Sequence, residues 1–353
     1  MRTIGRLLLS AIFLVLTVLL VLAAKYAPAL VFSFYPELSR KLLSAISSVT
    51  RAIPLAVWEL LAGLAVLWLL YTFVRIFTQR RSFLCWLAGI VLGVCVGLFL
   101  FVALWGLNHF GPTVDEQLGL SVREYTKQEL TDATRYYAAQ VNALADDVSR
   151  DDQGLAQLSS FEELSKQAGA GYDKLAARYE LFTGSHDPVK KLATWRMFSQ
   201  FGITGIFVCF TGEACVNPDT YEVWLPFTMC HELAHRQTVA AEDGANFCAY
   251  LACMENESPE FQYSGAIAAY VYCHNALYQA DKTAASEIWQ SLKEGVRADI
   301  QAANTHYAQY EGKVQDAATK VNDTYLKAFS EEAGVQSYGE AADLLIAWYL
   351  EKK

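Results

Sequence analysis

Residues 7–24 read LLLSAIFLVLTVLLVLAA and contain no charged side chain. As an α-helix this run measures about 27 Å, close to the thickness of the hydrocarbon core of a bilayer. Arg2 and Arg6 precede it, as basic residues precede the apolar part of a signal peptide, but the run is long and no clear cleavage site precedes Lys25. We therefore expect a retained membrane-spanning helix at 7–24.

Two more apolar segments follow, at 53–74 and 83–107. The third segment is uncharged throughout, and the second contains one acid, Glu59. Glu59 is either a functional acid inside the bilayer or an acid near the helix end that reaches the headgroups, and we favour the second interpretation. Three spans make the chain a multi-pass membrane protein.

The composition divides the chain into two parts. Hydrophobic residues make up 54% and charged residues 18% of the 353 residues, which excludes a disordered chain and is unusual for a soluble enzyme. Residues 1–110 hold 9 basic and 2 acidic side chains, whereas residues 111–353 hold 19 basic and 35 acidic ones. A domain with this acidic excess repels phosphate, so we expect no nucleic-acid partner. We predict a membrane domain at 1–110 and a globular domain at 111–353.

The basic residues of the first 110 also bear on orientation. A short loop between the second and third spans holds Arg80 and Arg81, with Arg75 beside it, which favours a cytoplasmic location for this loop. The globular domain then lies outside the cytoplasm. Four basic residues in the first loop argue against this orientation: Lys25, Arg40, Lys41 and Arg51.

The globular domain is predicted to be mainly α with one small sheet. Capping-box spacings at Thr126–Glu129 and Ser160–Glu163 begin helices in a helical region at 121–200, with a third helix from Asp187. The β-branched and aromatic runs 203–210 and 221–225 predict a sheet within 203–225, with a turn at 217–219. Helical patterns return at 226–255 and at 262–353, with segments at about 226–238, 242–255, 262–280, 284–304, 306–330 and 337–350.

The string LPFTMCHELAH at 225–235 carries the strongest chemical signal. His231 and His235 are four residues apart, so on a helix they project from one face and can bind one zinc ion. Glu232 follows the first histidine, where it can act as a general base toward water activated by that ion. This H-E-x-x-H pattern predicts a zinc site of the metallopeptidase kind.

A catalytic zinc needs a third protein ligand, and the nearest acids are Glu242 and Asp243. In one unbroken helix Glu242 would lie about 10 Å along the axis from His235, out of reach. The helix must therefore end between them, near Thr238, although no glycine eases the turn. We predict Glu242 as the ligand and keep Asp243 as the alternative, either in that role or as a neighbour of the site. Asn246, one turn later, can orient a ligand imidazole.

With these residues the chain resembles gluzincin-type metallopeptidases. The pattern E-x-x-A-D/N after H-E-x-x-H is similar to the HtpX, CAAX-prenyl-protease and ImmA-like families. The strings FTGEACVN (210–217), EDGANF (242–247), YSG (263–265) and QSYG (336–339) resemble, more closely, an uncharacterised bacterial family with N-terminal membrane spans and a predicted zinc peptidase domain. The resemblance implies a zincin-like fold, with Glu242 as third zinc ligand and Asn246 as its supporting residue. The family has Gly at the position of Thr238 and an acid at the position of Gly244.

Other features are less specific. The oxyanion of a peptidase needs a hydrogen-bond donor, and among Tyr263, His274 and Arg236 we choose Tyr263 because it lies in the Tyr-Ser-Gly piece. Residues 205–217 could hold a substrate strand or be a purely structural hairpin. His109, His186 and His306 are read as ordinary residues. Six of the eight cysteines lie in the globular domain, as disulfides or as free thiols.

These expectations give a membrane-anchored, mainly α protein: three N-terminal transmembrane helices followed by a mostly helical zincin-like domain, with a small β-sheet beside the active-site helix. Its predicted function is hydrolysis of peptide bonds with Zn²⁺ as cofactor, Glu232 as general base and a peptide or protein as substrate. The alternative is a non-catalytic membrane sensor or scaffold that retains a zinc-binding peptidase-like fold. The sequence gives no indication of the oligomeric state.

Overall fold

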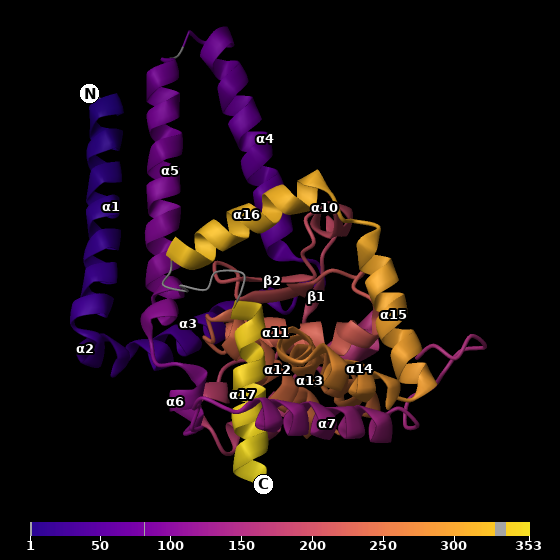
Figure 1. Cartoon of the computed structure of the whole chain (residues 1–353). Helices are drawn as coiled ribbons and strands as arrows, with labels where there is room; N and C mark the ends of the chain where they lie inside the picture. The colour runs from indigo at the N-terminus through magenta and orange to yellow at the C-terminus, as the bar shows by residue number, and fades with distance from the viewer. Residues whose placement is uncertain (1, 81, 329–336) are drawn as a thin grey trace.

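Three long apolar helices extend from one side of a helical body in the computed structural model, which describes residues 2–80, 82–328 and 337–353 (Figure 1). They are α1 (Arg2–Tyr26), α4 (Val57–Thr78) and α5 (Phe83–Leu104), and each is long and apolar enough to cross a membrane. Most of their side chains pack against no protein, as lipid-facing helices require. The expected membrane-anchored, mainly α architecture is confirmed.

The spans differ from the predicted ones at their ends. The second begins at Val57 rather than at residue 53, because residues 51–55 form turns around Pro54, which disfavours helix in the residue before it. The third ends at Leu104, and the chain continues as a short 3₁₀ helix, η1 (Gly106–Phe110). Arg81, part of the orientation argument, lies outside the described residues.

Between the first two spans, α2 (Pro28–Phe32) packs near the ends of α1 and α5, and α3 (Tyr35–Thr50) lies against the helical body. Leu43 of α3 packs in one buried cluster with Trp105, Cys209 and Ala240. The Thr50 hydroxyl donates a hydrogen bond to the Thr211 carbonyl at 2.9 Å. This part of the predicted membrane domain is thus packed on the globular part of the chain.

The sheet has three short strands in the order β1-β3-β2: β1 (Lys190–Lys191), β2 (Gly205–Val208) and β3 (Glu213–Val216). Strands β2 and β3 form an antiparallel hairpin with Gly205 opposite Val216, and β1 pairs with β3 in parallel. The hairpin turn contains Gly212 at a φ of +62°, which glycine adopts without strain. Strand β2 is therefore an edge strand of the sheet.

The predicted strand at 221–225 is wrong. These residues form a 3₁₀ turn, η3 (Glu222–Trp224), that leads into α11 (Leu225–Arg236). Val223 and Leu225 are buried, so the apolar pattern there reflects core packing and not a strand. The predicted turn at 217–219 exists: the Asp219 amide donates to the Asn217 side-chain oxygen at 2.9 Å, but the turn follows the hairpin instead of joining its strands.

The helical segments are largely as expected. The capping boxes at Thr126 and Ser160 are present, and each begins a helix. The helix predicted from Asp187 is wrong, because the short strand β1 follows this residue. The segment 284–304 divides into two helices, and the end of 306–330 and residue Gln336 lie outside the described residues. The remaining helices, with one more 3₁₀ turn, η2 (Glu180–Phe182), are α6 (Val114–Leu118), α7 (Lys127–Leu144), α8 (Phe161–Gln167), α9 (Ala170–Ala176), α10 (Trp195–Gln200), α12 (Glu242–Glu255), α13 (Pro259–Ala280), α14 (Lys282–Gln290), α15 (Glu294–Ala308), α16 (Lys313–Ala328) and α17 (Ser337–Lys352).

Helix α12 and the first half of α13 form the centre of the core. Residues 244–253 of α12 are all buried, as are residues 263–270 of α13. All eight cysteines are free thiols, which resolves the open question of disulfides. Most of α12 and the first half of α13 are thus buried with no covalent cross-link among the cysteines.

A buried ion pair fixes the start of α4 on the sheet. Glu213 of β3 accepts hydrogen bonds from the backbone amides of Val57 and Trp58, each at 2.9 Å, and pairs with Lys190 at 2.5 Å. The Glu59 carboxylate of α4 likewise accepts hydrogen bonds from the backbone amides of Ala193 and Thr194. Glu59 therefore lies in the first turn of α4, near the helix end as we favoured, and there it binds the globular part of the chain.

Candidate functional site

A sharp turn between α11 and α12 forms the site. Helix α11 ends at Arg236, and α12 begins six residues later at Glu242. Thr238 takes a φ of +74°, in the left-handed region that β-branched residues rarely adopt. Its amide donates to the His235 carbonyl at 3.0 Å, which closes the helix end. The predicted break between His235 and Glu242 is present, and it is made without glycine.

The turn brings His231, His235 and Glu242 together. One ligand atom from each lies within 4.8 Å of the other two. The two Nε2 atoms are 3.1 Å apart, and the Glu242 oxygens lie 3.3 Å from Nε2 of His231 and 3.8 Å from Nε2 of His235. Two imidazoles and a carboxylate are a common zinc ligand set. Asp243, the alternative ligand, is not part of this group.

The hydrogen bonds of the two histidines test whether a cation fits between them. His235 Nδ1 lies 2.7 Å from the Val239 carbonyl, which can only accept, so this nitrogen carries the proton. His231 Nδ1 lies 2.9 Å from the Asn246 side-chain oxygen, the supporting contact expected for Asn246. Neutral imidazoles held in this way direct two Nε2 lone pairs at each other. The arrangement is stable only with a positive charge between them, a proton or a metal ion.

The electrostatics keep two of the three ligands in binding-competent states, whereas the burial of His231 is outweighed by Glu242 and Glu232, which raise its pKa. Burial lowers the pKa of His235 to about 4, so this imidazole is neutral near pH 7. Burial alone would raise the pKa of Glu242, but the two histidines outweigh it and lower that pKa to about 2. A neutral imidazole and an ionised carboxylate are the forms that bind a divalent metal.

Glu232 lies beside this group on α11, where β2 passes closest. Its side chain is buried, and its Oε2 has no hydrogen-bond partner among the described residues. Burial raises the pKa of Glu232 to about 8, so this acid is protonated near pH 7 unless a cation held by the neighbouring ligands lowers that pKa again. A Cβ added to Gly205 would lie 2.3 Å from Glu232 Oε1, so only glycine at this position leaves room for the carboxylate. A buried acid with an unsatisfied oxygen and a raised pKa is typical of catalytic carboxylates.

These residues lie on the wall of a cavity of about 1410 Å³. Residues 203–207 of the edge strand β2 and the segment just before it form one side of the cavity. The end of the span α5 contributes Phe101 and Trp105, and α16 contributes Val314 and Val321. The cavity therefore joins the candidate metal-binding group, a strand edge that has no partner among the described residues, and the end of an apolar span.

A family model described as a protein of unknown function (DUF3810) matches residues 33–346. The chain belongs to this family. No curated protein and no solved structure matches the chain. The part of the chain that matches the DUF3810 model includes α4, α5 and the whole candidate site, so the junction between span and site lies within the family's shared region.

The structure places Tyr263 elsewhere, so its predicted contact with an oxyanion is wrong. Its hydroxyl donates to Asp299 at 2.5 Å and accepts from Arg150 at 3.1 Å, and the residue is fully buried. The other two donors considered, Arg236 and His274, are also not among the residues that line the cavity. In this DUF3810 member Tyr263 instead joins α13 to α15 through Asp299.

Three cavity residues were missed in the sequence. Tyr272 lines the cavity near Glu242. It is nine residues after Tyr263, which corresponds to two and a half helical turns, so the two tyrosines lie on opposite faces of α13. His109 of η1 also lines the cavity, with its ring 5.1 Å from that of Trp105. Trp105 donates from its indole nitrogen to the His235 carbonyl at 3.0 Å. No spacing rule links residues 105–109 to 231–242, because only the packed fold brings them together.

Proposed function

We propose that this protein is a membrane-anchored zinc-dependent peptidase, with His231, His235 and Glu242 as metal ligands and Glu232 as general base. The observation that carries the proposal is the convergence of the three ligands on one point beside a buried, unsatisfied carboxylate. The resemblance of the H-E-x-x-H and E-x-x-A-N strings to gluzincin peptidases supports the same chemistry.

Each residue has a distinct task in this proposal. A zinc ion bound at the site would supply acidity to water and Lewis acidity toward a carbonyl oxygen. Asn246 and the Val239 carbonyl hold the two imidazoles by Nδ1, which leaves Nε2 of each as the nitrogen that would bind the ion. Glu232 accepts a proton from the attacking water at its carboxylate and passes it to the leaving amine. Tyr272 and His109 are two cavity residues able to donate to the substrate oxyanion.

The edge strand β2 provides a means to hold the substrate. Its outer edge has no partner strand among the described residues and faces the cavity. An extended peptide added to this edge would form main-chain hydrogen bonds that do not depend on its sequence. This supports a peptide or protein substrate over a small molecule.

Activity of the full-length protein in detergent micelles tests the proposal. We expect the zinc-loaded wild type to cleave a broad fluorogenic peptide library, and Glu232→Gln to abolish cleavage while zinc content stays the same. Zinc retained by both proteins with no cleavage by either would favour the sensor or scaffold alternative. Cleavage that persists in Glu232→Gln would refute the role of this residue.

We also propose that the globular domain lies outside the cytoplasm. In support, two of the basic residues that argued against this orientation are paired with acids of the domain: Arg51 with Asp187 at 3.2 Å and Arg40 with Glu180 at 3.8 Å. An alkaline phosphatase fused to the C-terminus is expected to be active. An inactive fusion, together with a fluorescent green fluorescent protein fusion at the same point, would contradict this orientation.

A further inference from the structure

We infer that the site acts at the surface of the bilayer, on a polypeptide anchored in the same membrane, and cuts it a few residues from where it leaves the lipid. This inference rests on the proposed peptidase function and names the substrate class. It is carried by the position of the end of α5, by the exposed apolar residues at the cavity rim, and by the way α16 is held.

The first step is the depth of the site. Helix α5 has 22 residues and measures about 33 Å, close to the roughly 30 Å of a hydrocarbon core. Trp105 follows its last residue, at the level where tryptophan is enriched in membrane proteins. The Trp105 indole is hydrogen-bonded to the His235 backbone, and the two rings are 6.0 Å apart. The metal-binding group thus lies within one side chain of the end of the span, at headgroup depth.

The second step is the continuity of the cavity with the lipid-facing surface. Phe101 of α5 lines the cavity, and its helix neighbours Leu98 and Leu100 are exposed on the span. Val314 and Val321 of α16 also line the cavity, yet 51% and 71% of their surfaces are exposed. Exposed apolar side chains at the rim of a cavity favour an apolar surrounding or an apolar ligand. The rim is suited to a chain that emerges from lipid.

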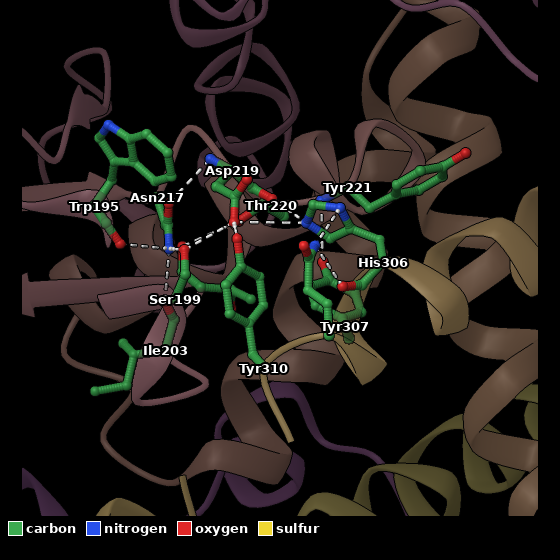
Figure 2. A network of polar contacts seen from close by, with 12 residues as sticks. Trp195, Ser199, Ile203, Asn217, Asp219, Thr220, Tyr221, His306, Tyr307 and Tyr310 are labelled. Carbon is green, nitrogen blue, oxygen red and sulfur yellow. Dashed lines mark hydrogen bonds and ion pairs between the residues drawn. The ribbon is translucent and has the colours of Figure 1, made fainter. Parts of the chain in front are cut away.

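The third step concerns the segment that precedes α16, because residues 306–310 anchor the start of this helix to the rest of the domain. In Figure 1, helix α16 runs between the end of α10 and the lower end of α5. Just before it, Tyr310 donates to the Asp219 carboxylate and His306 Nε2 contacts the Asp219 carbonyl, each at 2.7 Å (Figure 2). The Tyr307 hydroxyl accepts the Tyr221 amide at 3.1 Å in the same network. These contacts join the end of α15 to the turn after β3 and so direct α16 over the cavity.

A paired substrate tests the inference. One probe is a 20-residue Leu/Ala helix followed by a labelled segment of 20 mixed residues, inserted in phosphatidylcholine vesicles that contain the full-length protein. The other is the labelled segment alone, added to the same vesicles. We expect the anchored probe to be cut at least about tenfold faster, within about five residues of the helix end, or about 17 Å of extended chain. Glu232→Gln should cut neither.

A substitution at the rim adds a readout specific to the cavity mouth. Val321→Asp is expected to slow cleavage of the anchored probe several-fold with zinc content unchanged. Val122→Asp is the matched control, because Val122 is 42% exposed and is not among the residues that line the cavity. An equal effect of the two substitutions would overturn the role of this rim.

The outcomes separate the two proposals. Equal rates for the free and anchored probes, or cuts spread along the labelled segment, would overturn this inference and leave the peptidase function standing. Cleavage of neither probe by the zinc-loaded wild type would overturn both. Faster cleavage of the anchored probe near the membrane, lost in Glu232→Gln, supports both.

Discussion

Thr238 shows how much a single residue decides in this site. The left-handed turn at this position is what allows Glu242 to reach the histidine pair, and a β-branched side chain is strained there.

We therefore predict that Thr238→Gly stabilises the protein by about 1 kcal/mol relative to Thr238→Ala, because Ala keeps the strained Cβ and Gly does not. Both variants lose the hydroxyl that Arg40 contacts at 3.4 Å, so the pair isolates the backbone effect. Thermal unfolding in detergent should show a midpoint about 2–4 °C higher for the glycine variant. A lower midpoint for glycine than for alanine would argue against strain at this position.

Gly205 offers a second test at the residue scale. Its added Cβ would overlap the Glu232 carboxylate, so Gly205→Ala must displace the proposed general base. Because a displacement of about 1 Å can cost about 100-fold in rate, we expect a loss of that order in kcat/KM with full zinc content. Gly93→Ala is the control, since nothing lies within 4 Å of a Cβ built there. Equal activity of the two variants would contradict the role of Glu232.

The residues of the site were only partly predictable. Local spacing predicts that His231 and His235 share a helix face, and the reach of Glu242 follows once a helix break is assumed. The choice of Tyr263 over Tyr272 failed because both lie on one helix, and the sequence does not say which face of α13 meets the cavity. His109 and Trp105 come from more than 120 positions earlier in the chain, where no local pattern connects them to the site.

At the scale of elements, the junction between α4 and the sheet depends on Glu213. Burial alone would raise the pKa of Glu213, but Lys190 and the amides of Val57 and Trp58 outweigh it and lower the pKa below the ordinary value of 4.5. A group with a lowered pKa stabilises the folded state above its unfolded pKa, and this contribution is lost as the pH falls. The junction should therefore weaken below about pH 4.5.

We predict that Glu213→Gln destabilises the protein by about 3 kcal/mol, because it leaves Lys190 buried without its counter-charge. The unfolding midpoint near pH 7 should fall by about 6–12 °C. Glu59→Gln, which removes a charge at the same junction but keeps an acceptor oxygen, should cost about 1 kcal/mol. The difference between wild type and Glu213→Gln should shrink as the pH falls below 4.5. A difference that grows with acidity would contradict the account of this ion pair.

The helices were easier to predict than the strands, for a physical reason. Capping boxes and long periodic segments, as at Thr126, are local signals that the fold preserves. The strands are two to four residues long, and the run 221–225 has the same apolar character as a strand although it begins a helix. Its buried Val223 packs in the core in either case, so composition alone cannot distinguish the two.

At the scale of the whole molecule, span and site form one structure. Helix α3 packs on the globular part, and α4 begins on the sheet. Trp105, which follows α5, is hydrogen-bonded to the helix that carries both histidines. The opposite charges of the two parts of the chain predict a membrane part and a water-exposed part. They do not reveal that the two parts share a cavity, because that depends on contacts between distant segments.

The central claim is that His231, His235 and Glu242 hold one metal ion, and elemental analysis of the full-length protein tests it most directly. After incubation with zinc and removal of the excess, the wild type and Asp243→Asn should each retain one zinc ion per chain. His235→Ala and Glu242→Ala should retain less than about one-tenth of that, since loss of one of three ligands removes most of the affinity. A wild type that holds no zinc, or full zinc occupancy in both His235→Ala and Glu242→Ala, would contradict the account.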